Sequence, residues 1–236
     1  LKSGYQEITL LGQNVNSYKT PEGDFPVLLD KLGKIKAIKR IRYTSPHPRD
    51  IDEHLLKVMV KHDNICNQIH LPLQAGSSRI LKRMNRTYTK EEFLNLVDMI
   101  RTYIPDCGLS TDIIVGFPGE TEEEFQETLE VVSKVKFDTA FMFKYSARPG
   151  TKASHYTDHI SEDVKQSRLQ TLIEFQHNIS LMNNRKRIGL NLDVVIEKES
   201  KKSANQWAGR IESNTWVIFD KKDGYKIGDM VNINII

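Results

Sequence analysis

The chain has 236 residues, of which 39% are hydrophobic and 28% charged, the composition of an ordinary water-soluble globular protein. Its formal net charge of +3 is too small to indicate nucleic-acid binding by itself. No apolar run approaches the ~20 residues of a membrane helix, so we expect a cytoplasmic protein with no membrane partner. Two cysteines, Cys66 and Cys107, exclude a disulfide framework and are too few for a structural zinc or a four-iron cluster. The chain starts at Leu1 rather than Met, so we interpret it as a piece of a longer protein.

Basic residues are concentrated in two segments that contain no acidic residue, 31–42 and 77–90. Their members are Lys31, Lys34, Lys36, Lys39, Arg40 and Arg42 in the first segment, and Arg79, Lys82, Arg83, Arg86 and Lys90 in the second. Such clusters can pair with phosphates, or they can be solvated helix faces, and the sequence leaves both interpretations open.

Short apolar runs alternate with helix-like segments over the first ~175 residues, a pattern that predicts successive βαβ units. The runs are rich in β-branched and aromatic residues, as buried parallel strands are. The expected strands are 6–11, 40–45, 67–71, 109–116 and 138–145. This order predicts an α/β fold, either a barrel or an open parallel sheet, with its site on the loops after the carboxyl ends of the strands.

Three helices between these strands carry a capping-box signature at their start. Asp50, Thr89 and Thr121 are each followed three residues later by a glutamate, which allows two backbone N–H groups to be satisfied reciprocally. The glutamate-rich run 120–130 is therefore interpreted as the first turns of a helix, where acids complement the helix dipole, rather than as an acidic binding tail.

The character of the sequence changes in its last third. Residues 161–187 have apolar side chains at helical spacing and predict one long helix. Four short β-like runs follow, separated by turn-forming residues, and predict a small antiparallel barrel. We therefore expect a βα domain over 1–175 with a linking helix to about 187, and a β module over 188–236.

Polar and turn-forming residues gather where each expected strand ends, in 12–18, 44–48, 72–78, 115–120 and 145–151. Loops that merely connect need only turn formers, whereas these also carry amides, hydroxyls, a histidine and an arginine. Convergence of such groups at one edge of a sheet favours a ligand site. Taken alone, His47 is interpreted as a hydrogen-bonding loop residue rather than a metal ligand, and 116–119 could be no more than a turn.

Four blocks make the sequence specific: EITLLGQNVNSY, HLPLQAGSSRILKRMNRTYTKEEF, TDIIVGFPGETEEEF and FMFKYSARPGT. Together they resemble the methylthiotransferase family of radical-SAM enzymes, and the C-terminal β module resembles a TRAM domain, a small RNA-binding barrel. Within that family, GQNVNSY resembles the tRNA-2-methylthio-N6-dimethylallyladenosine synthase branch, and not the branch that acts on ribosomal protein S12.

The resemblance implies a partial TIM-like βα barrel followed by the TRAM-like module, here lacking the first βα unit of the barrel. It implies S-adenosyl-L-methionine bound at a 4Fe–4S cluster held by CxxxCxxC, and a second 4Fe–4S cluster that delivers the sulfur. It also implies tRNA as substrate, C2 of N6-isopentenyladenosine beside the anticodon as target, and an external electron donor.

The sequence departs from the family in one respect: no CxxxCxxC occurs, and neither Cys66 nor Cys107 matches a cluster ligand. Both cysteines are interpreted as packing residues. We therefore assign no catalytic residue and no metal ligand in this chain, and we expect the chain to be inactive alone.

The resemblance also suggests site residues. Those expected to bind the cofactor or face the target base lie on the strand-end loops and are Gln13, Asn14, Ser45, His47, Gln74, Asp112, Val115, Gly116, Phe117, Pro118, Phe143, Tyr145 and Arg148. Those expected to contact RNA lie in the β module and are Lys201, Lys202, Trp207 and Arg210, cations for phosphates and an indole for stacking. The alternative for Trp207 is a place in the core of the module.

Three other functions remain possible from the sequence. The same family could act on threonylcarbamoyladenosine in tRNA or on ribosomal protein S12. The chain as it stands could be a tRNA-binding module without catalysis. A barrel hydrolase using Asp112 or Glu120 lacks a recognisable acid/base pair.

Overall fold

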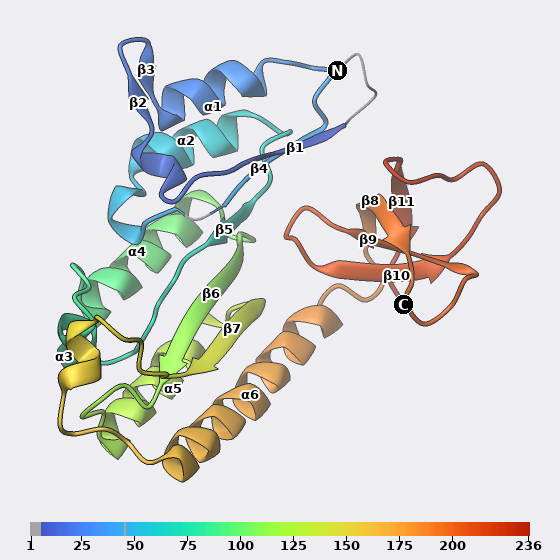
Figure 1. The fold of residues 1–236 in the computed structure, drawn as a ribbon. Coiled ribbons are helices and arrows are strands. Elements are labelled where there is room, and N and C mark those ends of the chain that lie inside the picture. The colour runs from blue at the N-terminus through green and yellow to red at the C-terminus, as the bar shows by residue number, and fades with distance from the viewer. Residues whose placement is uncertain (1–5, 45) are drawn as a thin grey trace.

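The structure is a computed structural model that describes residues 6–44 and 46–236. Figure 1 shows an α/β part, a long helix α6 that leads away from it, and a small β module beside the strands β1 and β4. The expected order of a βα part followed by a β module is therefore confirmed.

Five parallel strands run side by side in chain order. They are β1 (Glu7–Leu10), β4 (Arg40–Tyr43), β5 (Gln68–His70), β6 (Gly108–Val115) and β7 (Thr139–Lys144). β1 pairs with β4, and β5 with β6 and β6 with β7, all in parallel register. An isolated parallel bridge between Ile41 and Ile65 joins the two sheets. All five predicted strands are present, and together they form an open, partial barrel.

Helices cover one side of this sheet, as Figure 1 shows. They are α1 (Phe25–Gly33), α2 (Glu53–Lys61), α3 (Ser78–Arg83), α4 (Lys90–Tyr103) and α5 (Glu122–Val135). Short 3-10 turns η1 (Val15–Ser17), η2 (Pro48–Asp50) and η3 (Lys152–His155) lie in the loops, and a small hairpin pairs β2 (Lys19–Thr20) with β3 (Gly23–Asp24).

Two of the three predicted capping boxes are confirmed. Thr89 and Thr121 begin α4 and α5, and in each case the glutamate at the third helical position returns the hydrogen bond. The prediction for Asp50 is wrong, because α2 begins after Asp52, whose carboxylate accepts from the Leu55 N–H. Pro48 fixes a 3-10 turn that ends at Asp50, and the Asp50 side chain instead accepts from Asn14.

The strands alternate between a buried face and an accessible one. On β6, Leu109 and Ile113 are fully buried against the helices, whereas Ser110 and Asp112 face the other way and are only partly covered. Phe143 on β7 is 53% exposed on that same side. The side away from the helices therefore carries polar and aromatic groups that the barrel core does not bury.

The C-terminal part starts with α6 (Glu162–Arg185), which packs on β7 and α5. It continues with β8 (Asn191–Glu199), β9 (Gln206–Arg210), β10 (Trp216–Asp220) and β11 (Met230–Asn234), antiparallel in the order β10-β9-β8-β11. The sheet curls into a half-barrel around its own small core of Val194, Ile196, Ile211 and Val231. The long helix and the four β runs of the prediction are confirmed.

Two arginines of β4 attach the module to the barrel. Arg40 donates to the carbonyl oxygens of Arg210 and Asp193, at 2.7 and 2.6 Å. Arg42 donates to those of Glu212 and Ile211, at 2.7 and 2.8 Å. Both side chains are almost completely buried, so these two members of the basic segment 31–42 are structural and do not meet solvent phosphates.

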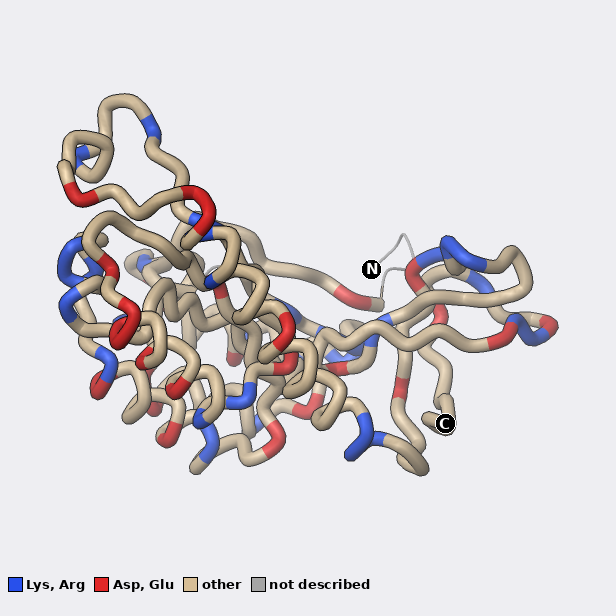
Figure 2. Tube along the Cα trace, turned by 90° about the horizontal axis from the view of Figure 1, so that it is seen from below, with Lys and Arg blue, Asp and Glu red and all other residues tan. Residues whose placement is uncertain are grey.

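Within the described residues, none of the helices combines the length and the apolar character needed to cross a membrane. Figure 2 shows acidic and basic residues interspersed over the barrel and the module. Any binding surface for an anion must therefore come from local groups whose charge the neighbouring acids leave unpaired.

Candidate functional site

A cavity of about 920 Å³ opens at the carboxyl ends of the strands. Six of the predicted site residues line it: Gln74, Asp112, Phe117, Phe143, Tyr145 and Arg148. They come from the loop after β5, from β6 and its following loop, and from β7 and its following loop. The fold thus gathers into one cavity residues that are up to 74 positions apart in the sequence, and the volume lies at the upper end of the ~300–1,000 Å³ of small-molecule sites.

Gln74 is held at the edge of this cavity by its backbone. Its N–H donates to Asp112 O and its carbonyl accepts from Ile114 N–H, both at 2.8 Å, which continues the pairing of β5 with β6. Its φ of +67° is unusual for a residue other than glycine, and such strain is found at functional sites. Two residues on, Gly76 lies so close to α5 that a Cβ there would be 2.3 Å from Thr128 Cα, so only glycine fits.

His70 lies beside Asp112 and was not predicted as a site residue. Its Nε2 is 3.3 Å from Asp112 Oδ2, and its Nδ1 is 3.0 Å from Ser110 Oγ. The ring of Phe141 packs edge-on against the imidazole. His70 pairs with Ser110 in the parallel register of β5 and β6, which places it on the same face as Ser110 and Asp112.

Asn14 and His47 are brought together at the ends of β1 and β4, but as members of a loop network. Asn14 Oδ1 accepts from the His47 N–H at 3.1 Å, and Asn14 Nδ2 donates to Asp50 at 2.7 Å. His47 Nδ1 accepts from the Arg49 N–H, and burial lowers the pKa of His47. His47 therefore orders its loop as a neutral imidazole. Gln13 is exposed beside this network, and Ser45 lies outside the described residues.

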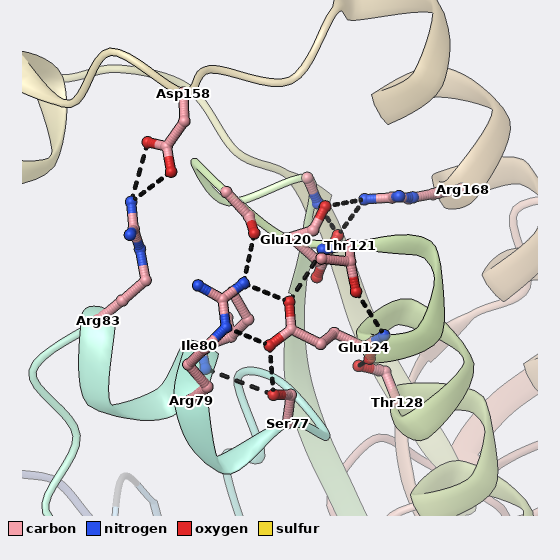
Figure 3. Close-up of polar contacts among 12 residues, drawn as sticks. Ser77, Arg79, Ile80, Arg83, Glu120, Thr121, Glu124, Thr128, Asp158 and Arg168 are labelled. Carbon is pink, nitrogen blue, oxygen red and sulfur yellow. Dashed lines mark hydrogen bonds and ion pairs between the residues drawn. The ribbon is translucent and has the colours of Figure 1, made fainter.

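The turn after β6 is fixed by a buried ion pair. Gly116 N–H donates to Glu120 Oε2 at 2.7 Å, and Arg168 of α6 donates to the same oxygen at 2.9 Å (Figure 3). Glu120 is 3% exposed, and its burial raises the pKa of its carboxyl, which Gly116 and Arg168 partly offset. Phe117 packs against Tyr145, with ring centroids 5.0 Å apart, so this turn forms one wall of the cavity.

Three of the four residues expected in this turn, Val115, Gly116 and Pro118, do not line the cavity. Val115 is fully buried in the core among the helices, and its carbonyl accepts from the Tyr145 N–H. Pro118 is buried as well. Both hold the turn in place from behind, and Gly116, with a φ of +70°, lies so close to Lys165 of α6 that a side chain would clash.

Glu124 ties the loop after β5 to the start of α5. It accepts from Ser77 Oγ at 2.9 Å, from Arg79 Nε at 2.7 Å and Nη2 at 2.6 Å, and from the Thr121 N–H at 2.9 Å (Figure 3). Burial alone would raise the pKa of Glu124, but the bonds from Arg79, Thr121 and Ser77 outweigh it and lower the pKa to about 2. The two loops that flank the cavity are thus joined through one carboxylate.

This arrangement predicts an acid-sensitive link. Because the pKa of Glu124 is lower in the folded chain than the ordinary 4.5, its contribution to stability is complete above that value. The contribution is lost as the pH falls from about 4.5 towards 2. In Glu124→Gln, we expect the free energy of unfolding, measured by urea titration, to depend less on pH over this range than in the wild type. Equal slopes for the two proteins would contradict the assignment.

The predicted RNA contacts of the module have different surroundings. Lys201 and Lys202 are exposed in the turn between β8 and β9. Trp207 packs against the core of the module, with Lys221 Nζ 4.3 Å from its ring centroid. Arg210 is paired with Glu197 and lies over the ring of Trp216.

Trp216 is the aromatic residue of the module that the sequence reasoning missed. It is 47% exposed, and Lys198 Nζ lies 4.3 Å from its ring centroid. Each of the two tryptophans occupies a β run, so the sequence alone does not show which of them faces solvent. Which of them faces solvent is decided by the register of β9 against β10.

The two cysteines lie at the opposite ends of the strands, on a cavity of about 1010 Å³ between the barrel and the module. Burial raises the pKa of Cys66 to about 11 and that of Cys107 to about 12, so both are thiols at neutral pH. Across 6–44 and 46–236, no three His, Cys, Asp or Glu side chains are grouped as metal ligands. These residues do not fit a 4Fe–4S cluster, which takes thiolates.

Comparison with known proteins identifies the class. Residues 1–132 match the Radical SAM superfamily, and residues 185–236 match the TRAM domain. The fold is similar to that of coproporphyrinogen III oxidase from Escherichia coli, described as a radical SAM enzyme, with a TM-score of 0.54 and 16% identity over 88% of this chain and 54% of that one. The chain belongs to the radical SAM superfamily and carries a TRAM domain.

Curated relatives show which proteins of this superfamily the chain is similar to. Proteins called tRNA-2-methylthio-N(6)-dimethylallyladenosine synthase are 48% identical to this chain in Parabacteroides distasonis, 47% in Acetivibrio thermocellus and 48% in Chlorobium phaeobacteroides. Each alignment covers 99% of this chain but only 52%, 49% and 53% of the relative. The chain thus spans about half the length of the curated relatives it matches.

Proposed function

We propose that this chain is part of a radical-SAM methylthiotransferase that modifies C2 of N6-isopentenyladenosine beside the anticodon of tRNA. The observation that carries the proposal is the 48% identity to a tRNA-2-methylthio-N(6)-dimethylallyladenosine synthase along 99% of the chain. In this proposal the reaction is cytoplasmic, and the division is a βα part over 1–175, a linking helix to about 187 and an RNA-binding module over 188–236.

The cavity at the strand ends fits S-adenosylmethionine. Its walls combine aromatic rings with an amide and a carboxylate, Gln74 and Asp112, which suit a nucleoside. Two buried donors of cavity-lining residues, Arg83 Nε and Tyr145 Oη, have no hydrogen-bond partner among the described residues. A polar ligand would satisfy donors that are otherwise costly to bury. In radical-SAM enzymes this cofactor, bound at a reduced iron–sulfur cluster, supplies a 5′-deoxyadenosyl radical.

In this proposal the residues of this chain bind S-adenosylmethionine and orient it in the cavity. Asp112 accepts hydrogen bonds from ligand hydroxyl or amino groups, and His70 holds its carboxylate in place. Gln74, whose strained backbone is paired with β6 beside Asp112, supplies an amide from the loop after β5. Phe117, fixed by the Glu120–Arg168 pair behind it, provides an apolar surface for a purine. The ligands of both 4Fe–4S clusters, and the contact with an electron donor, fall to parts of the protein other than these residues.

The test uses the intact protein, with its cluster-binding region, a chemical reductant and S-adenosylmethionine. We expect tRNA that carries N6-isopentenyladenosine to gain one methylthio group in place of one hydrogen, detected by mass spectrometry of its nucleosides. tRNA that carries threonylcarbamoyladenosine and isolated ribosomal protein S12 serve as competing substrates. Modification of either of these instead, or of none, would refute the proposed substrate.

A further inference from the structure

The mouth of the strand-end cavity has a charge that the proposed cofactor does not use. Six basic residues line it, against one acidic residue, Asp112, within the described part of the chain. We propose that four of them, Lys82, Arg86, Arg148 and Lys152, form a phosphate-binding rim that holds the RNA backbone on either side of the nucleotide entering the cavity. This assignment of the rim rests on the proposed tRNA substrate.

The local structure of α3 fixes one side of the rim. The helix ends at Arg83 with Met84 as its C-cap, and Asn85 follows in the left-handed region, at a φ of +60°. Arg86 N–H donates to Leu81 O and Asn85 N–H to Lys82 O, the two bonds of a Schellman motif. The motif turns the chain directly after the helix, so Lys82 and Arg86 reach the same cavity from its last turn and its exit.

A tight turn after β7 fixes the other side. Pro149 and Gly150 occupy its two central positions, and Gly150 has a φ of +81°, as a type II turn requires. Thr151 closes the turn by donating from its N–H and its hydroxyl to Arg148 O. Arg148 therefore begins this turn, and Lys152 follows its last residue directly.

The two sides of the rim, α3 and the segment after β7, are joined by an ion pair and a hydrogen bond. Arg83 of α3 forms two hydrogen bonds of 2.9 Å with Asp158, and its guanidinium lies 4.6 Å from the ring centroid of Tyr156 (Figure 3 shows the pair with Asp158). Gly119 N–H also donates to Asp158 O. The segment that follows β7 is thus held against α3, and the four rim residues surround one opening although they lie far apart in the sequence.

These four cations differ from the neighbouring basic residues in their ion pairing. Arg79, Arg83 and Lys90 of the same basic segment are paired with Glu124, Asp158 and Glu127. The four rim side chains are exposed, and within 6–44 and 46–236 none of them has an acidic partner. The sequence left open whether this segment meets phosphates or solvent, and the structure assigns the two roles to different members.

The chemistry of the cavity favours RNA over a small anion. Enzymes that modify a base draw it out of its stack and hold it between aromatic side chains, while cations contact the backbone outside. Here Phe117, Phe143, Tyr145 and Tyr156 line the interior, and the free cations stand at its mouth. A free phosphate would contact the cations alone, whereas a nucleotide within an RNA can contact both the cations and the aromatic walls.

The test measures binding of the 236-residue chain to an unmodified tRNA anticodon stem-loop over a series of salt concentrations. Each phosphate contact to single-stranded nucleic acid contributes roughly 0.7 to the slope of log K against log salt. In Lys82→Ala/Arg86→Ala we expect the magnitude of the slope to fall by about 1.4, and in Arg148→Ala/Lys152→Ala by a similar amount. The control is Lys36→Ala/Lys134→Ala, which removes two exposed lysines at the opposite ends of the strands and should leave the slope unchanged.

The outcomes distinguish a failure of the proposed rim from a failure of the proposed function. If the wild-type chain binds the stem-loop and both rim variants keep its slope, the rim is refuted and the proposed function stands. A wild-type chain that does not bind the stem-loop would refute the rim, whereas the proposed function is tested separately by methylthiolation with the intact protein. An equal loss of slope in the control variant would show non-specific attraction to any lysine and would also refute the rim. Thermal unfolding of each variant confirms that it is folded.

Discussion

Replacing Arg168 with methionine is expected to destabilise the chain by about 3–5 kcal/mol, because it leaves the buried Glu120 without its cationic partner. Methionine keeps most of the apolar contact with Phe125, over whose ring the guanidinium lies, so the loss is electrostatic. The Gly116 N–H still donates to Glu120, but one such bond does not compensate for a buried carboxylate. The turn that forms a wall of the cavity should loosen with it.

The loss of stability in Arg168→Met should depend on pH in a defined direction. Burial already raises the pKa of Glu120 above the ordinary 4.5, and without Arg168 the shift should increase. A carboxyl with a raised pKa in the folded state loses stability as the pH rises from its unfolded pKa through its folded one. The deficit of Arg168→Met against the wild type should therefore be small near pH 4 and grow towards neutral pH.

The measurement is the free energy of unfolding by urea titration between pH 4 and pH 8. Adding Glu120→Gln to Arg168→Met removes the unpaired charge and should restore part of the stability at neutral pH. Glu120→Gln alone provides the second corner of a double-mutant cycle. A loss that does not change with pH, or a double variant no more stable than Arg168→Met, would contradict this account.

The double variant Arg40→Met/Arg42→Met is expected to release the β module from the barrel. It removes four hydrogen bonds from guanidinium groups to backbone carbonyls, each worth about 1.5–3 kcal/mol, and leaves those carbonyls near a buried surface. The Glu7 carboxylate, 3.1 Å from Arg42 Nε, also loses its partner. We expect the single unfolding transition to split, with the module unfolding before the barrel.

Differential scanning calorimetry and limited proteolysis measure this release. Cleavage in 186–190, between α6 and β8, should become at least tenfold faster in the double variant. The matched control is Lys36→Met, an exposed lysine of the same basic segment, for which we expect a change within about 0.5 kcal/mol. A double variant that unfolds in one transition at the wild-type temperature would show that the arginines do not attach the module.

Local sequence rules predicted the elements of this fold well. The five parallel strands, the long helix and the four β runs each have a hydrophobic period or a set of turn residues that is contained within the element. Thr89 and Thr121 were correct for the same reason, since a capping box is a relation between residues three positions apart. Asp50 failed because Asp52, two residues on, offers the same chemistry, and Pro48 decides between them.

The site was predictable only in outline. Loops after parallel strands must meet at one edge, so the sequence could indicate the loops that hold Gln74 and Phe117. Asp112 lies within a strand, and only the family resemblance suggested it. His70 was missed because its role depends on Asp112 of the neighbouring strand, and a pairing register cannot be read from one strand alone. Val115 was predicted as a site residue, but the alternation of side chains along β6 turns it towards the helices, where it is buried.

By itself, the sequence determined the order of the elements, the division into a βα part and a β module, and the edge of the sheet that carries the site. These follow from periodicity, capping and turn chemistry, which act over a few residues. Only the tertiary structure decided which basic side chains form internal hydrogen bonds or ion pairs and which remain exposed without an acidic partner. Arg42 and Arg86 look alike in two acid-free segments, yet one binds the module in the interior and the other stands at the mouth of the cavity. That difference depends on which distant groups the fold places beside each guanidinium.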